Sequence, residues 1–208
     1  MIVFYTMHSE SPNIRKISIM LEEIGLPYTV KRVEKQNDGK FSDDFIAINP
    51  NATVPAIVDT DNGTTLFESG AILYYLAEKT RKLLPTDLKA RAEVVKWLMF
   101  EVANICPTMV ELYHYMLIDA EEISDAILQR YKDKLVRYCS ILNQQLDGRE
   151  YLCGEYSIAD IALYPWSVIL EDMAEINLGD YPNLRNWVTA ISNRATTLPA
   201  AQAVSSQN

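Results

Sequence analysis

The chain has 208 residues, 49% of them hydrophobic and 23% charged, which suits one large globular domain or two small ones. Its formal net charge of -9 argues against nucleic acid or an anionic membrane as the main partner, since both bind basic surfaces. No apolar run reaches the roughly 18 residues that span a bilayer, and the start of the chain lacks a signal-peptide pattern.

The cysteines and histidines limit the chemistry that the chain can support. Cys106, Cys139 and Cys153 form an odd and widely spaced set, which fits neither a disulfide framework nor a zinc motif. His8 and His114 are too isolated for a metal site. We therefore expect a protein of the reducing cytoplasm that holds no metal.

Residues 1–80 alternate between strand and helix patterns. The apolar run at 2–6 predicts a buried strand, and apolar residues at three- and four-residue steps from Pro12 predict a helix that ends at Gly25. The elements predicted after it are a strand at 28–33, a short helix at 43–48, strands at 55–59 and 64–67 joined by a hairpin turn at 61–63, and a helix at 68–80. This β-α-β-α-β-β-α order predicts an α/β domain whose first two strands run parallel.

A linker at 81–86 leads into a second domain at 87–208, which we expect to be all-helical. Helical patterns cover 88–117, about 127–146, a segment that starts at Ser157, and 184–191. The buried side of the first is expected to carry Val94, Val95, Leu98, Val102 and Ile105. Pro107 should kink this helix, because proline removes a backbone donor and clashes with the preceding turn.

Three strand–loop junctions of the first domain each allow two interpretations. Ser11-Pro12-Asn13 is a standard helix start, or else an anion site at a helix N-terminus. Val54-Pro55 is a proline at a strand edge, or a cis peptide whose Val54 backbone pairs with an extended peptide. Glu68-Ser69 caps a helix, or Ser69 takes a carboxylate while Glu68 takes an ammonium group.

The second domain carries a clear structural motif at "SIAD", Ser157 to Asp160. Its spacing is that of a capping box, and Tyr156 and Ile161 stand at the positions of a hydrophobic staple. We interpret it as structural, with a contribution of about 1–2 kcal/mol to the stability of the domain.

Taken together, these segments resemble the cytosolic glutathione transferase family over nearly the whole chain. "VPAIVD" and "FESGAILYYLAEK" resemble its glutathione site, and "YLCGEYSIADIALYPW" resembles its capping-box segment. "SPNIRKISIMLEE" is most similar to the bacterial and fungal branch that reduces disulfides with glutathione. The resemblance implies a thioredoxin-like first domain, an all-helical second domain and a two-fold homodimer.

The resemblance also implies how glutathione is bound. Ser11 falls where relatives with a Cys-Pro-x-Cys turn keep a nucleophilic cysteine, so Ser11 and Asn13 are expected to hold the glutathione sulfur as a thiolate. Val54, next to Pro55, would bind the cysteinyl backbone. The other expected ligand contacts are Glu68 with Ser69 at the γ-glutamyl end, and Lys40, or less favourably Asn51, at the glycine carboxylate, where relatives often carry a lysine at the position of Thr53.

Other residues are weighed as rivals or as contacts for a second substrate. The rivals for the sulfur are Tyr5, for which a core position is favoured, His8 and Ser9. The second substrate is expected between the domains, with Met109, Tyr113 and Trp166 as candidates. Cys106 either faces that space or is a buried, inert thiol.

The expected function is that of a glutathione-dependent enzyme, with glutathione as co-substrate and no metal. It would transfer glutathione to a small electrophile, as in detoxification, or reduce a disulfide. A non-catalytic regulatory or stress-response protein on the same scaffold is the alternative, and an isomerase or dehalogenase that uses the same thiol site is a third possibility.

Overall fold

A computed structural model describes residues 1–7, 11–36, 38–117 and 124–197 of the chain. They form two compact units, one of Met1–Leu84 together with the residues from Asn193 onward, and one of Pro85–Ser192. The boundary at residue 84 falls inside the predicted linker. The return of the chain to the first unit at Asn193 differs from the predicted second domain, which ran to residue 208.

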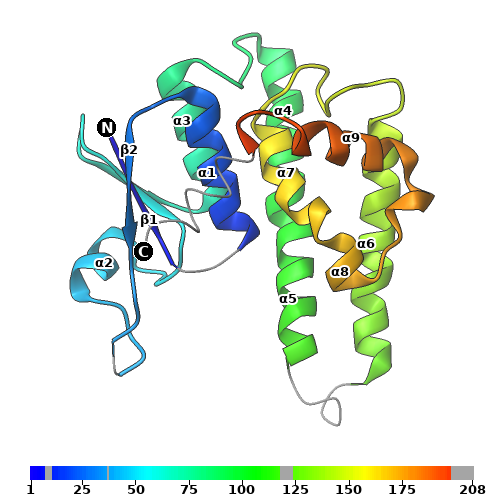
Figure 1. The fold of residues 1–208 in the computed structure, drawn as a ribbon, viewed down its shortest axis with the longest axis horizontal. Helices are drawn as coiled ribbons and strands as arrows, with labels where there is room; N and C mark the ends of the chain where they lie inside the picture. The colour runs from blue at the N-terminus through cyan, green and yellow to red at the C-terminus, as the bar shows by residue number, and fades with distance from the viewer. Residues whose placement is uncertain (8–10, 37, 118–123, 198–208) are drawn as a thin grey trace. The chain divides into compact units, whose positions relative to one another are not determined.

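A four-stranded sheet is the framework of the first unit (Figure 1). Its strands are β1 (Ile2–Thr6), β2 (Tyr28–Arg32), β3 (Ala56–Asp59) and β4 (Thr64–Phe67). Their order is β2-β1-β3-β4, with β1 parallel to β2 and antiparallel to β3, and β3 antiparallel to β4. The parallel first connection is as the sequence predicts.

In the part of the unit that the structure describes, three helices accompany the sheet: α1 (Pro12–Ile24), α2 (Asp43–Ile48) and α3 (Ser69–Thr80). Figure 1 shows α1 and α3 side by side on one face of the sheet and α2 on the other side. α1 ends at Gly25, whose left-handed backbone lets its N–H bond to Leu21 O at 3.0 Å, as the pattern predicts.

The strand register brings three chain segments to one end of the sheet. Tyr5 pairs with Ala56, and Ala56 pairs with Phe67. The last residues of β1, the first residues of β3 and the last residues of β4 therefore lie side by side. Since α1 follows β1 and α3 follows β4, both helices begin at this end of the sheet.

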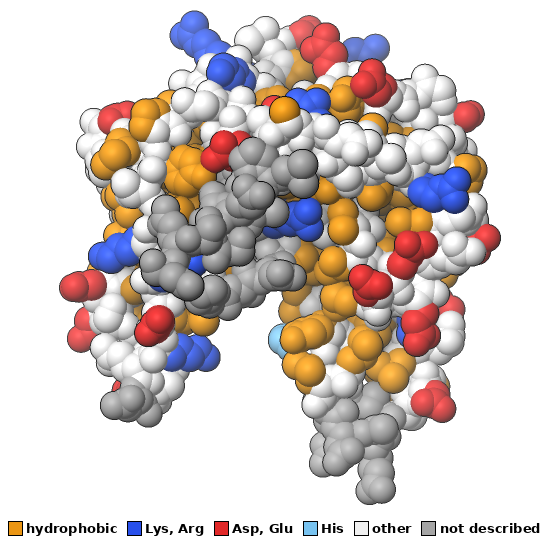
Figure 2. Space-filling view, viewed as in Figure 1, with side chains coloured by type: hydrophobic (Ala, Val, Ile, Leu, Met, Phe, Trp, Pro, Cys, Tyr) orange, Lys and Arg blue, Asp and Glu red, His pale blue; other side chains and the backbone are white. Residues whose placement is uncertain are grey.

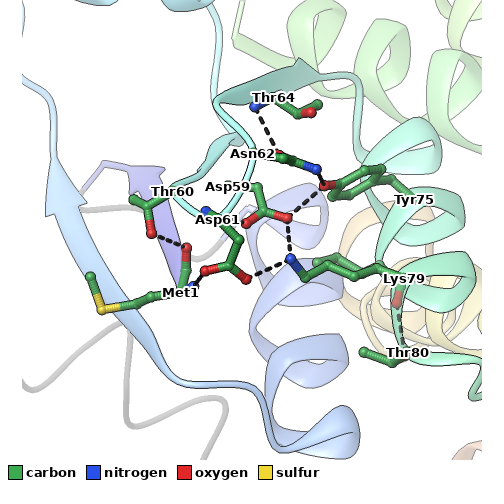
Figure 3. Close-up of polar contacts among 10 residues, drawn as sticks. Met1, Asp59, Thr60, Asp61, Asn62, Thr64, Tyr75, Lys79 and Thr80 are labelled. Carbon is green, nitrogen blue, oxygen red and sulfur yellow. Dashed lines mark hydrogen bonds and ion pairs between the residues drawn. The ribbon is translucent and has the colours of Figure 1, made fainter.

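A polar network fastens the opposite end of β3 (Figure 3). The Asp59 carboxylate is fully buried and accepts hydrogen bonds from Tyr75 at 2.5 Å and from Lys79 at 2.6 Å. Lys79 also binds Asp61 at 2.8 Å, and Asp61 binds the amino group of Met1 at 2.6 Å. The network ties the turn after β3 to α3 and to the start of the chain.

The second unit is helical. Its elements are α4 (Leu88–Phe100), a π-helical turn at Glu101–Ile105, α5 (Cys106–Leu117), α6 (Asp125–Gln145), α7 (Ile158–Val168), α8 (Leu170–Ala174), a 3-10 turn at Leu178–Asp180, and α9 (Pro182–Ser192). In Figure 1, α4 and α5 form one long column beside α6. None of the helices that the structure describes is long and apolar enough to cross a membrane.

The π-helical turn interrupts the long helical pattern just before Pro107. Here the N–H of Cys106 bonds to the carbonyl of Glu101, five residues back. This extra residue in the turn changes which side chains face inward: Glu101 is buried, and Val102 is 39% exposed. The prediction that Val102 lies on the buried side is therefore wrong, whereas Val94, Leu98 and Ile105 are buried as expected.

The capping box at the start of α7 is confirmed. The N–H of Ser157 donates to Asp160 Oδ2 at 3.0 Å, and the Ser157 side chain accepts from the first turn. Asp160 Oδ1 also accepts from the N–H of Leu152 at 3.0 Å and from Trp187 Nε1 at 2.9 Å. The motif therefore also joins α7 to the preceding loop and to α9.

An ion pair holds the chain after α9 against the first unit. Arg194 donates to Glu23 twice, from Nε at 2.8 Å and from Nη2 at 3.0 Å, and Thr196 donates to the same carboxylate at 2.5 Å. Glu23 lies in the last turn of α1. Such paired, two-pronged contacts are stronger than single ones and explain why this segment groups with the α/β elements.

The Asp59 network should make stability depend on pH in the acid range. Burial alone would raise the pKa of Asp59, but the bonds from Lys79 and Tyr75 hold it below its usual value, and Lys79 with the Met1 amino group lowers the pKa of Asp61 to about 2. Both carboxylates therefore contribute stability that is complete above their unfolded-state pKa of about 4 and is lost as the pH falls through the folded-state pKa.

Lys79→Met should consequently lower the melting temperature at neutral pH and flatten the loss of stability below about pH 4. Lys96→Met is the control, because the ion pair of Lys96 with Glu93 is exposed at the surface, where such pairs contribute little stability. Thermal denaturation of both variants across the acid range measures the effect. Identical pH profiles for the two variants would show that the Asp59 network is not a source of acid sensitivity.

Candidate functional site

The predicted site residues of the first unit meet where α1 and α3 begin. Asn13 belongs to the first turn of α1 and Ser69 is the first residue of α3. Ser69 Oγ donates to Asn13 Oδ1 across 3.2 Å, although the two residues are 56 positions apart in the chain. The tertiary structure thus joins two of the motifs that the sequence analysis singled out.

Lys16 contacts both of these side chains and was not among the predicted site residues. Its side chain is 0% exposed, and its Nζ donates to Asn13 Oδ1 at 2.7 Å and to Ser69 Oγ at 3.3 Å. One sequence signal is its spacing, since a residue three positions after Asn13 lies on the same face of the helix. A second is its place between Ile14 and Ile17, which belong to the apolar pattern of this helix.

The N-termini of α1 and α3 lack the side-chain caps that their sequences suggest. Ser11 and Glu68 occupy the N-cap positions, yet neither side chain bonds to the first turn, and neither helix has an acidic residue there. By contrast, Ser42 caps α2 by accepting from the N–H of Phe45. Ser11 and Glu68 therefore stand at the N-cap positions, as the standard helix-start interpretation expects, but they make no capping hydrogen bond. Helix starts of this kind suit an anion.

The segment at Val54-Pro55 lies beside Glu68. The Val54–Pro55 peptide is cis, and because Ala56 pairs with Phe67, the residues just before β3 lie next to those just after β4. Glu68 itself has a φ of 69°, a left-handed conformation that costs energy for a residue with a side chain. Backbone held in this way is concentrated at binding sites, which supports the functional interpretation of Glu68.

Asn49, the residue after α2, organises the loop that leads to Pro55, and it was not among the predicted site residues. It is fully buried. Its Nδ2 donates to Thr53 O at 2.6 Å, and its Oδ1 accepts from the N–H of Asn51 at 2.9 Å. The Thr53 hydroxyl also accepts from Asn49 Nδ2, at 3.3 Å. Asn49 therefore positions Asn51, Thr53 and the start of β3 together.

The remaining candidates of the first unit lie in different surroundings. Tyr5 is in the core, 8% exposed, with its ring 5.8 Å from that of Phe45, as the favoured interpretation had it. Lys40 is exposed in the loop before α2, where its carbonyl accepts from the N–H of Gln36 at 2.7 Å. His8 and Ser9 lie outside the described residues.

The candidates for a second-substrate site belong to the helical unit and differ in burial. Met109 is 0% exposed and Trp166 is 4% exposed, so both lie in the core of that unit. Tyr113, on α5, is 48% exposed. Cys106 is only partly buried, at the start of α5. Of the three predicted residues, Tyr113 is the one whose side chain is exposed enough to contact a ligand.

The first unit contains no cysteine, and two of the chain's three thiols have a raised pKa. No cysteine precedes Cys106 in the sequence, so none lies on α1 or α3. Burial raises the pKa of Cys139 to about 12 and likewise that of Cys153 to about 12. Within the described part of the chain, no group of three His, Cys, Asp or Glu side chains could hold a metal ion. The residues of the first unit therefore supply no sulfur of their own at this end of the sheet.

The chain matches two family models along most of its length. The first, "Glutathione S-transferase, N-terminal domain", covers residues 10–79, and the second, "Glutathione S-transferase, C-terminal domain", covers residues 105–195. The disulfide-bond oxidoreductase YfcG of Escherichia coli (strain K12) is 39% identical over 193 residues, which are 90% of this chain and 89% of that protein.

Solved structures of glutathione transferases also resemble this chain. A glutathione transferase family member from Pseudomonas fluorescens pf-5, crystallised with two glutathione bound, superposes with a TM-score of 0.87 at 35% identity and covers 96% of this chain and 92% of that one. A glutathione transferase from Pseudomonas putida with one glutathione disulfide bound per subunit has a TM-score of 0.87 at 33% identity, over 97% of this chain and 90% of that one. The chain therefore belongs to the glutathione S-transferase family, with a thioredoxin-like first unit and a helical second unit.

Proposed function

We propose that the protein binds glutathione at the starts of α1 and α3, keeps its sulfur as a thiolate, and uses that thiolate to reduce disulfides. The observation that carries the proposal is the start of α1: it has no side-chain cap and no acidic first-turn residue, and it carries Ser11 and Asn13. Transfer of glutathione to a small electrophile would begin from the same thiolate.

The energy needed to hold a thiolate is within reach of this arrangement. A free thiol has a pKa of about 8.5, and lowering it by about 2 requires roughly 2.7 kcal/mol of preference for the anion. A hydrogen bond to a charged acceptor supplies about 1.5–3 kcal/mol, and a helix N-terminus adds about 0.3–1 kcal/mol. One hydroxyl or amide donor at the start of α1 therefore suffices without a general base.

The other parts of glutathione have matching groups nearby. The Val54 backbone, next to Pro55, would pair with the cysteinyl residue. The start of α3 at Ser69 would take the γ-glutamyl carboxylate, and Glu68 would take the γ-glutamyl ammonium group. For the glycine carboxylate we retain Lys40 and Asn51, which are both exposed. Thr53 is the weaker choice, because its hydroxyl is already bonded to Asn49.

The proposed reaction consumes two molecules of glutathione. The first thiolate attacks one sulfur of a disulfide RSSR, forming the mixed disulfide RSSG and releasing RS⁻, which takes up a proton. A second glutathione thiolate attacks the mixed disulfide, so that glutathione disulfide and a second RSH leave. The relatives crystallised with two glutathione molecules or with glutathione disulfide support room for both partners in such a site.

The wider setting follows from the same proposal. A reaction that consumes reduced glutathione belongs in a reducing compartment, and the three cysteines of the chain are free of disulfides, which supports the cytoplasm. For contact with the second substrate we keep Tyr113 of the helical unit, which is exposed.

Substitutions at the start of α1 test the thiolate directly. Ser11→Ala and Asn13→Ala should each raise the pKa of bound glutathione by about 1, because each removes a donor to the charged sulfur. The ultraviolet absorbance of the thiolate as a function of pH measures this value. Ser42→Ala is the matched control, since this serine caps α2 in the usual way and should leave the bound thiol unaffected.

If neither substitution moves the thiolate titration, the assignment of the sulfur to this turn is wrong. A wild-type protein that shows no heat of association with glutathione would instead favour a non-catalytic protein on the same scaffold. The titration and the binding measurement therefore separate an error in the site from an error in the function.

A mechanism without a protein thiol makes a second prediction. A variant with Cys106→Ser, Cys139→Ala and Cys153→Ser should keep wild-type disulfide reductase activity, because the reactive sulfur belongs to glutathione. Steady-state rates with a small disulfide substrate measure it. Loss of activity in a variant that remains folded by circular dichroism would place a cysteine of the chain in the reaction.

We also propose that the protein is a homodimer, because apolar side chains are exposed on its surface. Figure 2 shows hydrophobic side chains gathered on one face of the helical unit. Apolar side chains that are exposed in the single chain, and that a dimer could cover, include Tyr74 on α3, Met99 on α4 and Val102 in the π-helical turn, which are 36%, 50% and 39% exposed. Sedimentation should find twice the chain mass of 23.7 kDa, and Met99→Glu should shift the protein toward the monomer. A wild-type monomer would contradict the proposal.

A further inference from the structure

We infer that Lys16 is a positioning residue for bound glutathione: its buried side chain orients Asn13 toward the sulfur and places a positive charge beneath both the sulfur and the γ-glutamyl carboxylate. The inference rests on the proposed function and deepens it. It starts from the contacts of Lys16 Nζ with Asn13 Oδ1 at 2.7 Å and with Ser69 Oγ at 3.3 Å.

The first step is the orientation of the Asn13 amide. A lysine ammonium group only donates hydrogen bonds, so the atom of Asn13 that faces Lys16 must be the oxygen. Ser69 Oγ donates to the same oxygen at 3.2 Å. The group that Asn13 can offer to an anion is therefore its Nδ2, a donor. Without Lys16 the amide could rotate and present its oxygen, which would repel a thiolate.

The second step concerns Ser69. Since the Ser69 hydroxyl hydrogen is directed to Asn13 Oδ1, its contact with a carboxylate should come from the backbone N–H at the start of α3, which has no side-chain cap. Lys16 donates to the Ser69 oxygen and so keeps this hydrogen directed at Asn13. One lysine thus sets the direction of both polar side chains at the two helix starts.

The third step is the position of the charge. The dipole of a helix makes its N-terminal end positive, so a cation near the start of α1 is unfavourable for the helix and favourable for a bound anion. The Lys16 side chain is 0% exposed, and away from water its electrostatic influence on a nearby ligand is stronger than at the surface. The position of the Lys16 charge therefore does not stabilise α1, but it favours the binding of two negative groups.

A purely structural role makes a different prediction from this one. If Lys16 serves only the fold, replacing it should lower stability. If it serves the ligand, an apolar residue of similar length should leave stability unchanged or raised, because buried charges are costly to keep. The thiol of bound glutathione should then become less acidic even though the protein remains folded.

The experiment compares the wild-type chain with Lys16→Met, Lys16→Gln and the control Lys82→Met. Lys82 donates to Ile24 O at 2.8 Å, at the far end of the same helix. Lys16→Met should raise the pKa of bound glutathione by about 1, a tenfold loss of thiolate near neutral pH, and weaken the binding of S-methylglutathione several-fold. Its melting temperature should not fall, and Lys82→Met should change neither ligand property.

The outcomes separate the inference from the proposed function. Wild-type binding of glutathione with an unchanged thiol pKa in Lys16→Met overturns the inference and leaves the proposed function standing. A lower melting temperature with an unchanged thiol pKa would mean that Lys16 serves only the stability of the fold, and this result also overturns the inference. Absence of wild-type binding overturns the proposed function itself. If Lys16→Met does not fold, Lys16→Gln, which keeps donors without the charge, decides in the same way.

Discussion

The contact of Asn13 Oδ1 with Ser69 Oγ and Lys16 Nζ joins the starts of α1 and α3, and the candidate site depends on it. The contact exists because β3 runs antiparallel to both of its neighbours. That arrangement places the end of β1, the start of β3 and the end of β4 at one end of the sheet. Two helix N-termini and the cis Val54–Pro55 peptide therefore meet at this end of the sheet.

The same unit contains both an ordinary helix start and two unusual ones, and the difference marks the site. α2 has a capping serine, Ser42, and two acidic residues in its first turn. α1 and α3 have neither, although a cap alone is worth about 0.5–2 kcal/mol. Glu68 adds a left-handed backbone. The start of α2 shows that this unit can form a side-chain cap. We infer that a bound anion takes the place of the missing caps at the starts of α1 and α3.

Much of the fold follows from local patterns. The short helix at Asp43–Ile48 and the strand at Thr64–Phe67 have the predicted bounds, and the capping box at Ser157 is formed. These features depend on residues a few positions apart, where spacing and side-chain type decide the conformation. Val102 shows the limit: its exposure depends on a π-helical turn that shifts the inward face, and the regular helical period gives no sign of that turn.

The sequence by itself determined the two-part architecture. It also determined which polar residues stand at the starts of two helices, namely Ser11, Asn13, Glu68 and Ser69. Only the tertiary structure decided that these starts meet, that Ser11 does not cap its helix, and that Lys16 lies between them. The physical reason is range. Lys16 and Ser69 are 53 positions apart, and the pairing of β1 with β3, two strands that are distant in the chain, brings them together.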